Sequence, residues 1–203
     1  PVMGVNNGLL LHPDAFLKEI HRQAKDNPIL WASMLAREGK MVPFGKHGET
    51  LEVLPHYAIA PETAYEVDQI ITCRHKSRRR YNDWMRTTFN RVGLPQVGEK
   101  MISLKNRWED IAGTTPLING LQVIVQREIK EDDINRNARS VSMTVAADGD
   151  PDTVWYWLPS NLYFCEPIPE RDANTDGDLA QFDYGYAITC HKSQGSEWDH
   201  GMY

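Results

Sequence analysis

Cysteine is scarce in this sequence: its three copies, Cys73, Cys165 and Cys190, show no framework spacing. An odd number of widely separated cysteines argues against a small secreted fold held together by disulfides. No apolar stretch approaches the roughly 20 residues that a membrane-spanning helix needs. The first residues have neither the basic head nor the apolar middle of a signal peptide. We therefore expect a soluble, cytoplasmic protein in a reducing compartment, without a membrane partner.

A net positive charge is also lacking. The chain carries a formal net charge of −6, whereas nucleic-acid-binding domains are often basic overall. Only the contact face needs positive charge, however. One basic cluster is present, made of Arg74, His75, Lys76, Arg78, Arg79 and Arg80. The cluster is typical either of a phosphate-binding surface with salt-dependent affinity or of the solvated start of a basic helix.

Two signatures of a complete nucleotide hydrolase are missing. No glycine-rich phosphate loop occurs, because Gly39-Lys40 and Gly45-Lys46 lack both the following Ser or Thr and the preceding spacing. No apolar strand ends in an Asp-Glu pair that could hold magnesium. These residues alone therefore have no phosphate loop with which to hydrolyse ATP.

Helical apolar spacing dominates the first part of the chain. With 203 residues, of which 41% are hydrophobic, the chain is long enough for one globular domain with or without a small insert. Trp84 falls on the apolar side of a basic helix, so we expect it in the core, although Trp84 and Trp108 could also stack on bases. The expected elements are a helix over 14–24, a helix capped by Asn27 and ended by Gly39, a short helix over 62–67, a strand over 70–73 and a basic helix over 76–90.

The middle of the chain has the pattern of a small all-β barrel. Turn signals such as Asn119-Gly120 separate short extended runs. In this barrel we expect one of Trp155 and Trp157 in the core and the other on the surface. The expected strands are 101–104, 121–128, 141–145 and 154–158. After an acidic linker over 166–181, we expect a buried strand over 184–189 and a helix beginning at Ser196.

The run from Tyr186 to Glu197 carries the chemistry. An apolar strand ends at Thr189, and small and polar residues follow, with Gly195 near their end. In α/β sheets ligands bind beyond the carboxyl ends of strands, and a glycine-containing turn lets backbone N–H groups face a ligand oxygen. The residues alone leave two alternatives open: a ligand-binding turn, or a polar loop with a helix cap at Ser196.

The run resembles motif V of superfamily 1 helicases, in the RecD-like branch that includes phage helicases. That motif reads tyrosine, alanine, a β-branched residue, threonine, any residue, histidine, lysine, a small residue, glutamine, glycine, a small residue and glutamate. Every position matches between Tyr186 and Glu197.

Segments near the beginning of the chain resemble the same family. Residues 16–29 resemble motif IV, whose Arg-Gln core falls on Arg22 and Gln23, and Pro1-Val2 resembles the tail of motif III. The resemblance implies that Arg22 reaches the γ-phosphate of ATP, a role that suits a planar, permanently charged guanidinium. Without the resemblance, Arg22 would be interpreted as a solvated arginine at a helix end.

A further segment, 70–82, resembles the family's strand-to-helix step, in which threonine, polar residues, arginine and asparagine follow one another. The β-rich middle lies where RecD-like helicases insert a small SH3-like barrel. The resemblance therefore implies an α/β, RecA-like domain of the P-loop NTPase type that lacks the P-loop half and contains an inserted all-β barrel. The implied boundaries are 1–94 and 167–203 for the motor domain and 95–166 for the barrel.

The resemblance also implies the site residues. We expect a catalytic Arg22; nucleotide-binding Arg22, Gln23, Gly195 and Glu197; and DNA-binding Thr72, Arg74, Asn82, Thr189, His191 and Ser193. ATP with Mg²⁺ would be bound mainly by a preceding RecA-like domain. The expected partners are single-stranded DNA, duplex junctions, that preceding domain, and replication or recombination proteins in a bacterial or phage-infected cell.

Motif VI would fall beyond Tyr203, so we expect the chain to be part of a longer helicase acting in DNA replication, recombination or repair. Two other function classes compete with this hypothesis. One is a non-catalytic nucleic-acid- or protein-binding module that keeps the helicase scaffold. The other is a metal or thiol enzyme built on Cys73 and Cys190, which the spacing disfavours because adjacent Cys-His pairs cannot easily chelate one ion. We expect no metal ligands in this chain.

Overall fold

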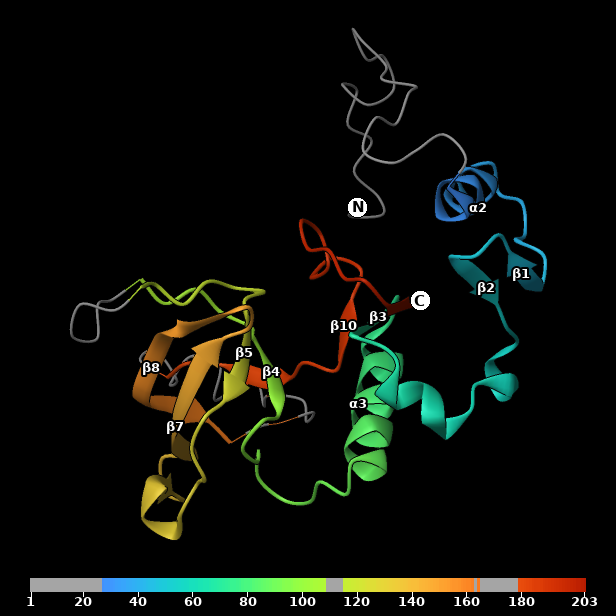
Figure 1. Ribbon diagram of the computed structural model, residues 1–203. Coiled ribbons are helices and arrows are strands. Elements are labelled where there is room, and N and C mark those ends of the chain that lie inside the picture. The colour runs from blue at the N-terminus through green and yellow to red at the C-terminus, as the bar shows by residue number, and fades with distance from the viewer. Residues whose placement is uncertain (1–26, 109–114, 163, 165–178) are drawn as a thin grey trace, which may run out of the picture. The chain divides into compact units, whose positions relative to one another are not determined.

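The computed structural model describes residues 27–108, 115–162, 164 and 179–203. The chain divides into two compact units, Pro1–Ile59 and Ala60–Tyr203. The helix expected over 14–24, together with Arg22 and Gln23, lies outside the described residues. In the described residues the fold is mixed α/β, with two α-helices and a curled antiparallel sheet (Figure 1). Neither helix is long and apolar enough to cross a membrane.

The first unit contains helix α2 (Pro28–Arg37) and a hairpin of β1 (Gly45–His47) and β2 (Leu51–Val53). The Asn27 side chain caps α2 by accepting a hydrogen bond of 2.8 Å from the Ile29 amide. Gly39 follows the helix with a φ of +72°, a conformation that glycine adopts without strain. The predicted cap and stop of this helix are confirmed. A 3₁₀ turn, η1 (His56–Ala58), ends the unit.

The second unit contains a small parallel sheet with strand order β10-β3-β11, made of β3 (Gln69–Thr72), β10 (Ala187–Thr189) and β11 (Gly201–Met202). Helix α3 (His75–Thr88) packs along one face of this sheet (Figure 1). Met85 of α3 contacts Ile70 and Ala187, and Trp84 packs against this cluster. The predicted strand and helix are therefore confirmed, and Trp84 is half-buried on the apolar side of the helix, at the edge of this core. η2 (Pro61–Tyr65) is a 3₁₀ helix near the predicted short helix.

The antiparallel sheet of the second unit has six strands in the order β6-β7-β5-β4-β9, with β8 paired to β7. Its core contains Met101, Val123 and Phe182 at 0% exposure. Trp155 is 4% exposed and Trp157 is 57% exposed, as predicted for one core and one surface tryptophan. The elements are β4 (Lys100–Ser103), β5 (Gln122–Val125), η3 (Glu131–Asp133), β6 (Ile134–Asn135), β7 (Ser140–Ala147), β8 (Asp150–Asn161) and β9 (Phe182–Tyr184).

The single strand expected over 184–189 is wrong. The chain leaves β9 at Tyr184, passes through Gly185 and Tyr186, and enters the parallel sheet as β10. A Cβ on Gly185 would lie 2.9 Å from the backbone carbon of Met101, so only glycine fits this close approach to β4. One apolar run thus serves two sheets, because the backbone changes partner at the glycine.

The helix expected from Ser196 is also wrong, since residues 190–195 form turns and 196–200 have no regular structure before β11. The amide of Ser196 donates to the carbonyl of Ser193, which continues the turn. Glu197, Asp199 and His200 are exposed and offer no apolar stripe for a helix to bury.

Candidate functional site

The candidate site begins where β3 and β10 end side by side. The two strands are parallel, with Thr189 opposite Thr72. Parallel strands end at the same edge of a sheet, so the segments that follow Thr72 and Thr189 are brought together there. The structure thus places next to each other two segments that lie 117 residues apart in the sequence (189 − 72 = 117).

Thr72 and Thr189 are buried at this sheet edge and hydrogen-bond to the backbone around it. They are 7% and 6% exposed. The Thr72 hydroxyl donates a hydrogen bond of 3.3 Å to the carbonyl of Ile188 in the neighbouring strand. The Thr189 carbonyl accepts from the amides of Lys192 and Ser193, at 2.8 and 3.1 Å, and so closes the turn. Both threonines therefore position the turn, and little of either side chain is open to a ligand.

The turn after Thr189 presents polar groups outward. His191 is exposed. Ser193 is half-buried, and its hydroxyl donates 2.9 Å to the carbonyl of Cys190. Gly195 has a φ of +87°, with open space where a Cβ would be, so the backbone conformation alone selects glycine there. Glu197 is exposed at the end of the turn.

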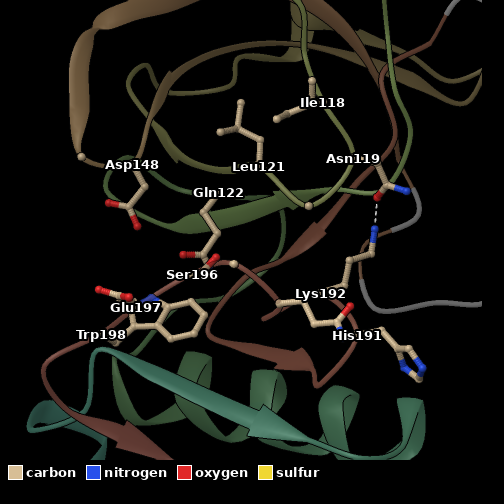
Figure 2. A pocket seen from close by; sticks show the side chains of 14 residues that line it. Ile118, Asn119, Leu121, Gln122, Asp148, His191, Lys192, Ser196, Glu197 and Trp198 are labelled. Atoms are coloured by element: carbon tan, nitrogen blue, oxygen red, sulfur yellow. Dashed lines mark hydrogen bonds between the residues drawn. The ribbon is translucent and has the colours of Figure 1, made fainter. Parts of the chain in front are cut away.

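A cleft of about 830 Å³ separates this turn from the antiparallel sheet. Residues 118–122, which connect into β5, form one wall, and residues 191 and 192 with 194–198 form the other. Figure 2 shows Lys192 extending across the cleft, where its ammonium group hydrogen-bonds the side chain of Asn119. Trp198 lines the same cleft. The volume of this open cleft lies within the range of clefts that bind ligands.

The charges around the cleft are unevenly distributed. Burial, and then the nearby Arg78, hold the pKa of Lys192 below the usual range of lysine. Asp148 lines the cleft but forms an ion pair of 3.1 Å with Lys100, which offsets its negative charge. The ammonium group of Lys192 therefore lies in the cleft, where it can bind an anion.

The basic residues at the start of α3 fall into two groups, exposed side chains and a largely buried side chain that forms an ion pair. Arg74, the residue before the helix, is exposed, as are Lys76 and Arg80. Arg78 instead forms an ion pair of 2.5 Å with Asp183 of β9, and the two side chains are 11% and 3% exposed. Arg78 thus ties α3 to the antiparallel sheet, while Arg74 remains open to a ligand.

Asn82 has a different position from the other predicted DNA contacts. It is 0% exposed, and its amide nitrogen donates to the carbonyls of Tyr184 and Ala187 at 2.9 and 3.2 Å. Its side-chain oxygen accepts from the amide of Ala187 at 2.8 Å. In this conformation Asn82 cannot touch a ligand, and it holds the segment in which the chain changes sheets.

Of the residues predicted for the site, the structure brings Thr72, Arg74, Thr189, His191 and Ser193 to one sheet edge, with Gly195 and Glu197 on the adjoining cleft. Sequence reasoning missed the cleft wall formed by residues 118–122, including Asn119. It also missed that Trp198 lines the cleft. The turn signal Asn119-Gly120 marks a loop, but nothing in the sequence pairs it with a lysine far along the chain.

Among the described residues, no group of three His, Cys, Asp or Glu side chains could hold a metal ion. The cleft offers hydrogen-bond donors, the half-buried cation of Lys192, the exposed carboxylate of Glu197 and an indole, a set suited to binding a polar ligand. No protein-family model matches this chain, and no curated protein matches it.

Proposed function

We propose that this chain is the second RecA-like domain of an ATP-dependent DNA helicase, with an inserted SH3-like barrel, and that the cleft holds single-stranded DNA. One observation carries the proposal. The run that resembles motif V forms the turn at the carboxyl end of β10, and that turn lines a cleft of about 830 Å³. A ligand-binding motif is useful only where a ligand can reach it, and this one is open.

The residues of the cleft suit single-stranded DNA. Lys192 supplies charge to a phosphate, and exposed His191 supplies a hydrogen-bonding ring at the rim. The indole of Trp198 offers an apolar surface on which a base can stack. Arg74 adds an exposed cation at the same sheet edge. In the proposal the buried threonines act through the turn that they fix.

In this proposal the last residues of the turn contact the nucleotide. Gly195 and Glu197 are exposed on the wall of the cleft, in the last part of the turn, so they can contact ATP there. Arg22 and Gln23, which lie outside the described residues, would contact the same nucleotide. The described residues offer no cluster of Mg²⁺ ligands. A preceding RecA-like domain would therefore hold ATP and Mg²⁺, and the turn would link the nucleotide to the DNA.

The proposal predicts that His191→Ala removes the stimulation of ATP hydrolysis by single-stranded DNA in the full-length protein. The physical reason is that the imidazole lies on the turn shared by the two ligands, so its loss uncouples them. The measurement is the ATPase rate with and without single-stranded DNA.

His200→Ala is the matched control, because His200 is exposed on the same connection but lies outside the cleft. The control should keep the stimulation. Normal stimulation in His191→Ala would remove His191 from the DNA site. Absence of any DNA-stimulated hydrolysis in the wild type would instead favour a non-catalytic binding module on this scaffold.

A further inference from the structure

Cys73 and Cys190 follow β3 and β10 directly. The pair of residues before them, Thr72 and Thr189, are register partners in the parallel ladder. The ladder continues one step, since the Cys190 amide donates 3.0 Å to the Thr72 carbonyl. Neighbouring strands lie about 4.8 Å apart, and disulfides join Cα atoms roughly 4.4–6.8 Å apart. A ladder continued by this step would bring the Cα atoms of the two cysteines within the range that a disulfide spans.

The two thiols also share a face of the sheet. Side chains alternate along a strand, so Cys73 lies on the side of Ile71 and Cys190 on the side of Ile188. These two isoleucines pack together in one cluster with Ile102, away from α3. The Cys190 thiol donates a hydrogen bond of 3.4 Å to the carbonyl of Thr72, the residue before Cys73. Burial, and then the proximity of Cys73, raise the pKa of the Cys190 thiol. Both cysteines are free and exposed.

We propose that Cys73 and Cys190 form an adjacent dithiol that is oxidised by small-molecule disulfides and closes to an intramolecular disulfide. One thiolate attacks the disulfide R–S–S–R, which forms a mixed disulfide and expels RS⁻. The second thiolate attacks the protein sulfur of that mixed disulfide, which forms the Cys73–Cys190 bond and expels the second RS⁻. Both thiol protons end on the expelled thiolates, so the protein is oxidised by two electrons and R–S–S–R is reduced to two RSH.

The chemistry fits the compartment expected for this chain. In a reducing compartment the pair stays as thiols, and it closes when the ratio of disulfide to thiol rises. The bond would fix the ends of β3 and β10 at the place where Arg74 and His191 leave the sheet. The proposal rests on the placement of the two thiols and does not depend on the proposed function.

The test uses the full chain incubated with oxidised glutathione, then digested without reduction and analysed by mass spectrometry. We expect a peptide pair joined through Cys73 and Cys190, with no glutathione retained on either. Cys73→Ser and Cys190→Ser should each retain glutathione on the remaining partner, because no second thiol can expel it. Glutathione retained on both cysteines of the wild type, or a bond from either one to Cys165, would overturn the proposal.

A second readout does not depend on oxidation. A trivalent arsenical, phenylarsine oxide, chelates two adjacent thiols, so single-serine variants should lose affinity by roughly 100-fold. Cys165→Ser serves as the matched control and should bind like the wild type. Equal loss in Cys165→Ser, or no loss in Cys73→Ser and Cys190→Ser, would show that the chelated pair is a different one.

Discussion

At the scale of single residues, buried polar side chains carry the connection between the two sheets. Gln69 is 1% exposed, and its amide nitrogen donates to the carbonyls of Gly185 and Tyr186 at 3.0 and 2.9 Å. The side-chain amide of Asn82 likewise donates to the carbonyls of Tyr184 and Ala187. The backbone between β9 and β10 makes single hydrogen bonds to both sheets, from the Gly185 amide to the Lys100 carbonyl and from the Ile70 amide to the Tyr186 carbonyl. The side-chain amides of Gln69 and Asn82 add buried hydrogen bonds to this connection.

Asn82→Ala is therefore expected to lower the free energy of unfolding by about 3 kcal/mol, since three buried hydrogen bonds lose their partner. Urea denaturation of the full chain measures this change in the free energy of unfolding. Asp83→Ala is the matched control: Asp83 is the next residue of α3 and is exposed, so its change should be within about 0.5 kcal/mol. Equal destabilisation by the two substitutions would contradict the structural role of Asn82.

At the scale of elements, the sequence predicts what local pattern controls. Alternating and helical apolar spacing predicts β3, β7 and α3, and the cap at Asn27 predicts α2, because each depends on neighbours in the chain. The change of sheet at Gly185 is not predictable this way. β9 and β10 are both fully buried, and the run from Tyr184 to Thr189 has no charged residue to mark a break, so the sequence pattern is continuous while the hydrogen-bonding partner changes.

Gly185→Ala tests that change of partner. The added methyl group would meet the Met101 backbone at 2.9 Å, and backbone cannot rotate away as a side chain can. We expect a loss of about 1–3 kcal/mol in the free energy of unfolding, as for other overpacked sites, measured by thermal or urea unfolding.

Gly201→Ala is the matched control, because there the nearest atoms, at 3.2 Å, belong to the exposed ring of Tyr203, which can move. It should leave stability nearly unchanged. A Gly185→Ala protein as stable as Gly201→Ala would mean that β9 and β10 do not require the close approach to β4.

At the scale of the whole molecule, a chain with a net charge of −6 must concentrate its positive charge to hold DNA. Sequence reasoning finds the polar turn after Thr189, because motif and turn are local. It does not find the wall at 118–122, because the pairing of Lys192 with Asn119 joins residues 73 positions apart. The partial neutralisation of the basic cluster by Asp183 is hidden for the same reason.

The most direct test of the proposed DNA-binding cleft is the affinity of the full chain for single-stranded DNA as a function of salt, in the wild type and in Lys192→Met. Loss of one phosphate contact should weaken binding and reduce the slope of log K against log salt by about 0.7. Lys130→Met, which removes an exposed lysine outside the cleft, should change neither.

The affinity for single-stranded DNA should also depend on pH, and the pKa of Lys192 fixes the direction of that dependence. The pKa of Lys192 lies below its usual 10.5 because of burial and Arg78. Its contribution to affinity is present below that lowered pKa and is lost as pH rises through it, whereas Lys192→Arg stays charged and should keep its affinity. We expect weaker binding and a smaller salt slope for Lys192→Met alone. An unchanged affinity and slope in Lys192→Met would contradict the cleft as the DNA site.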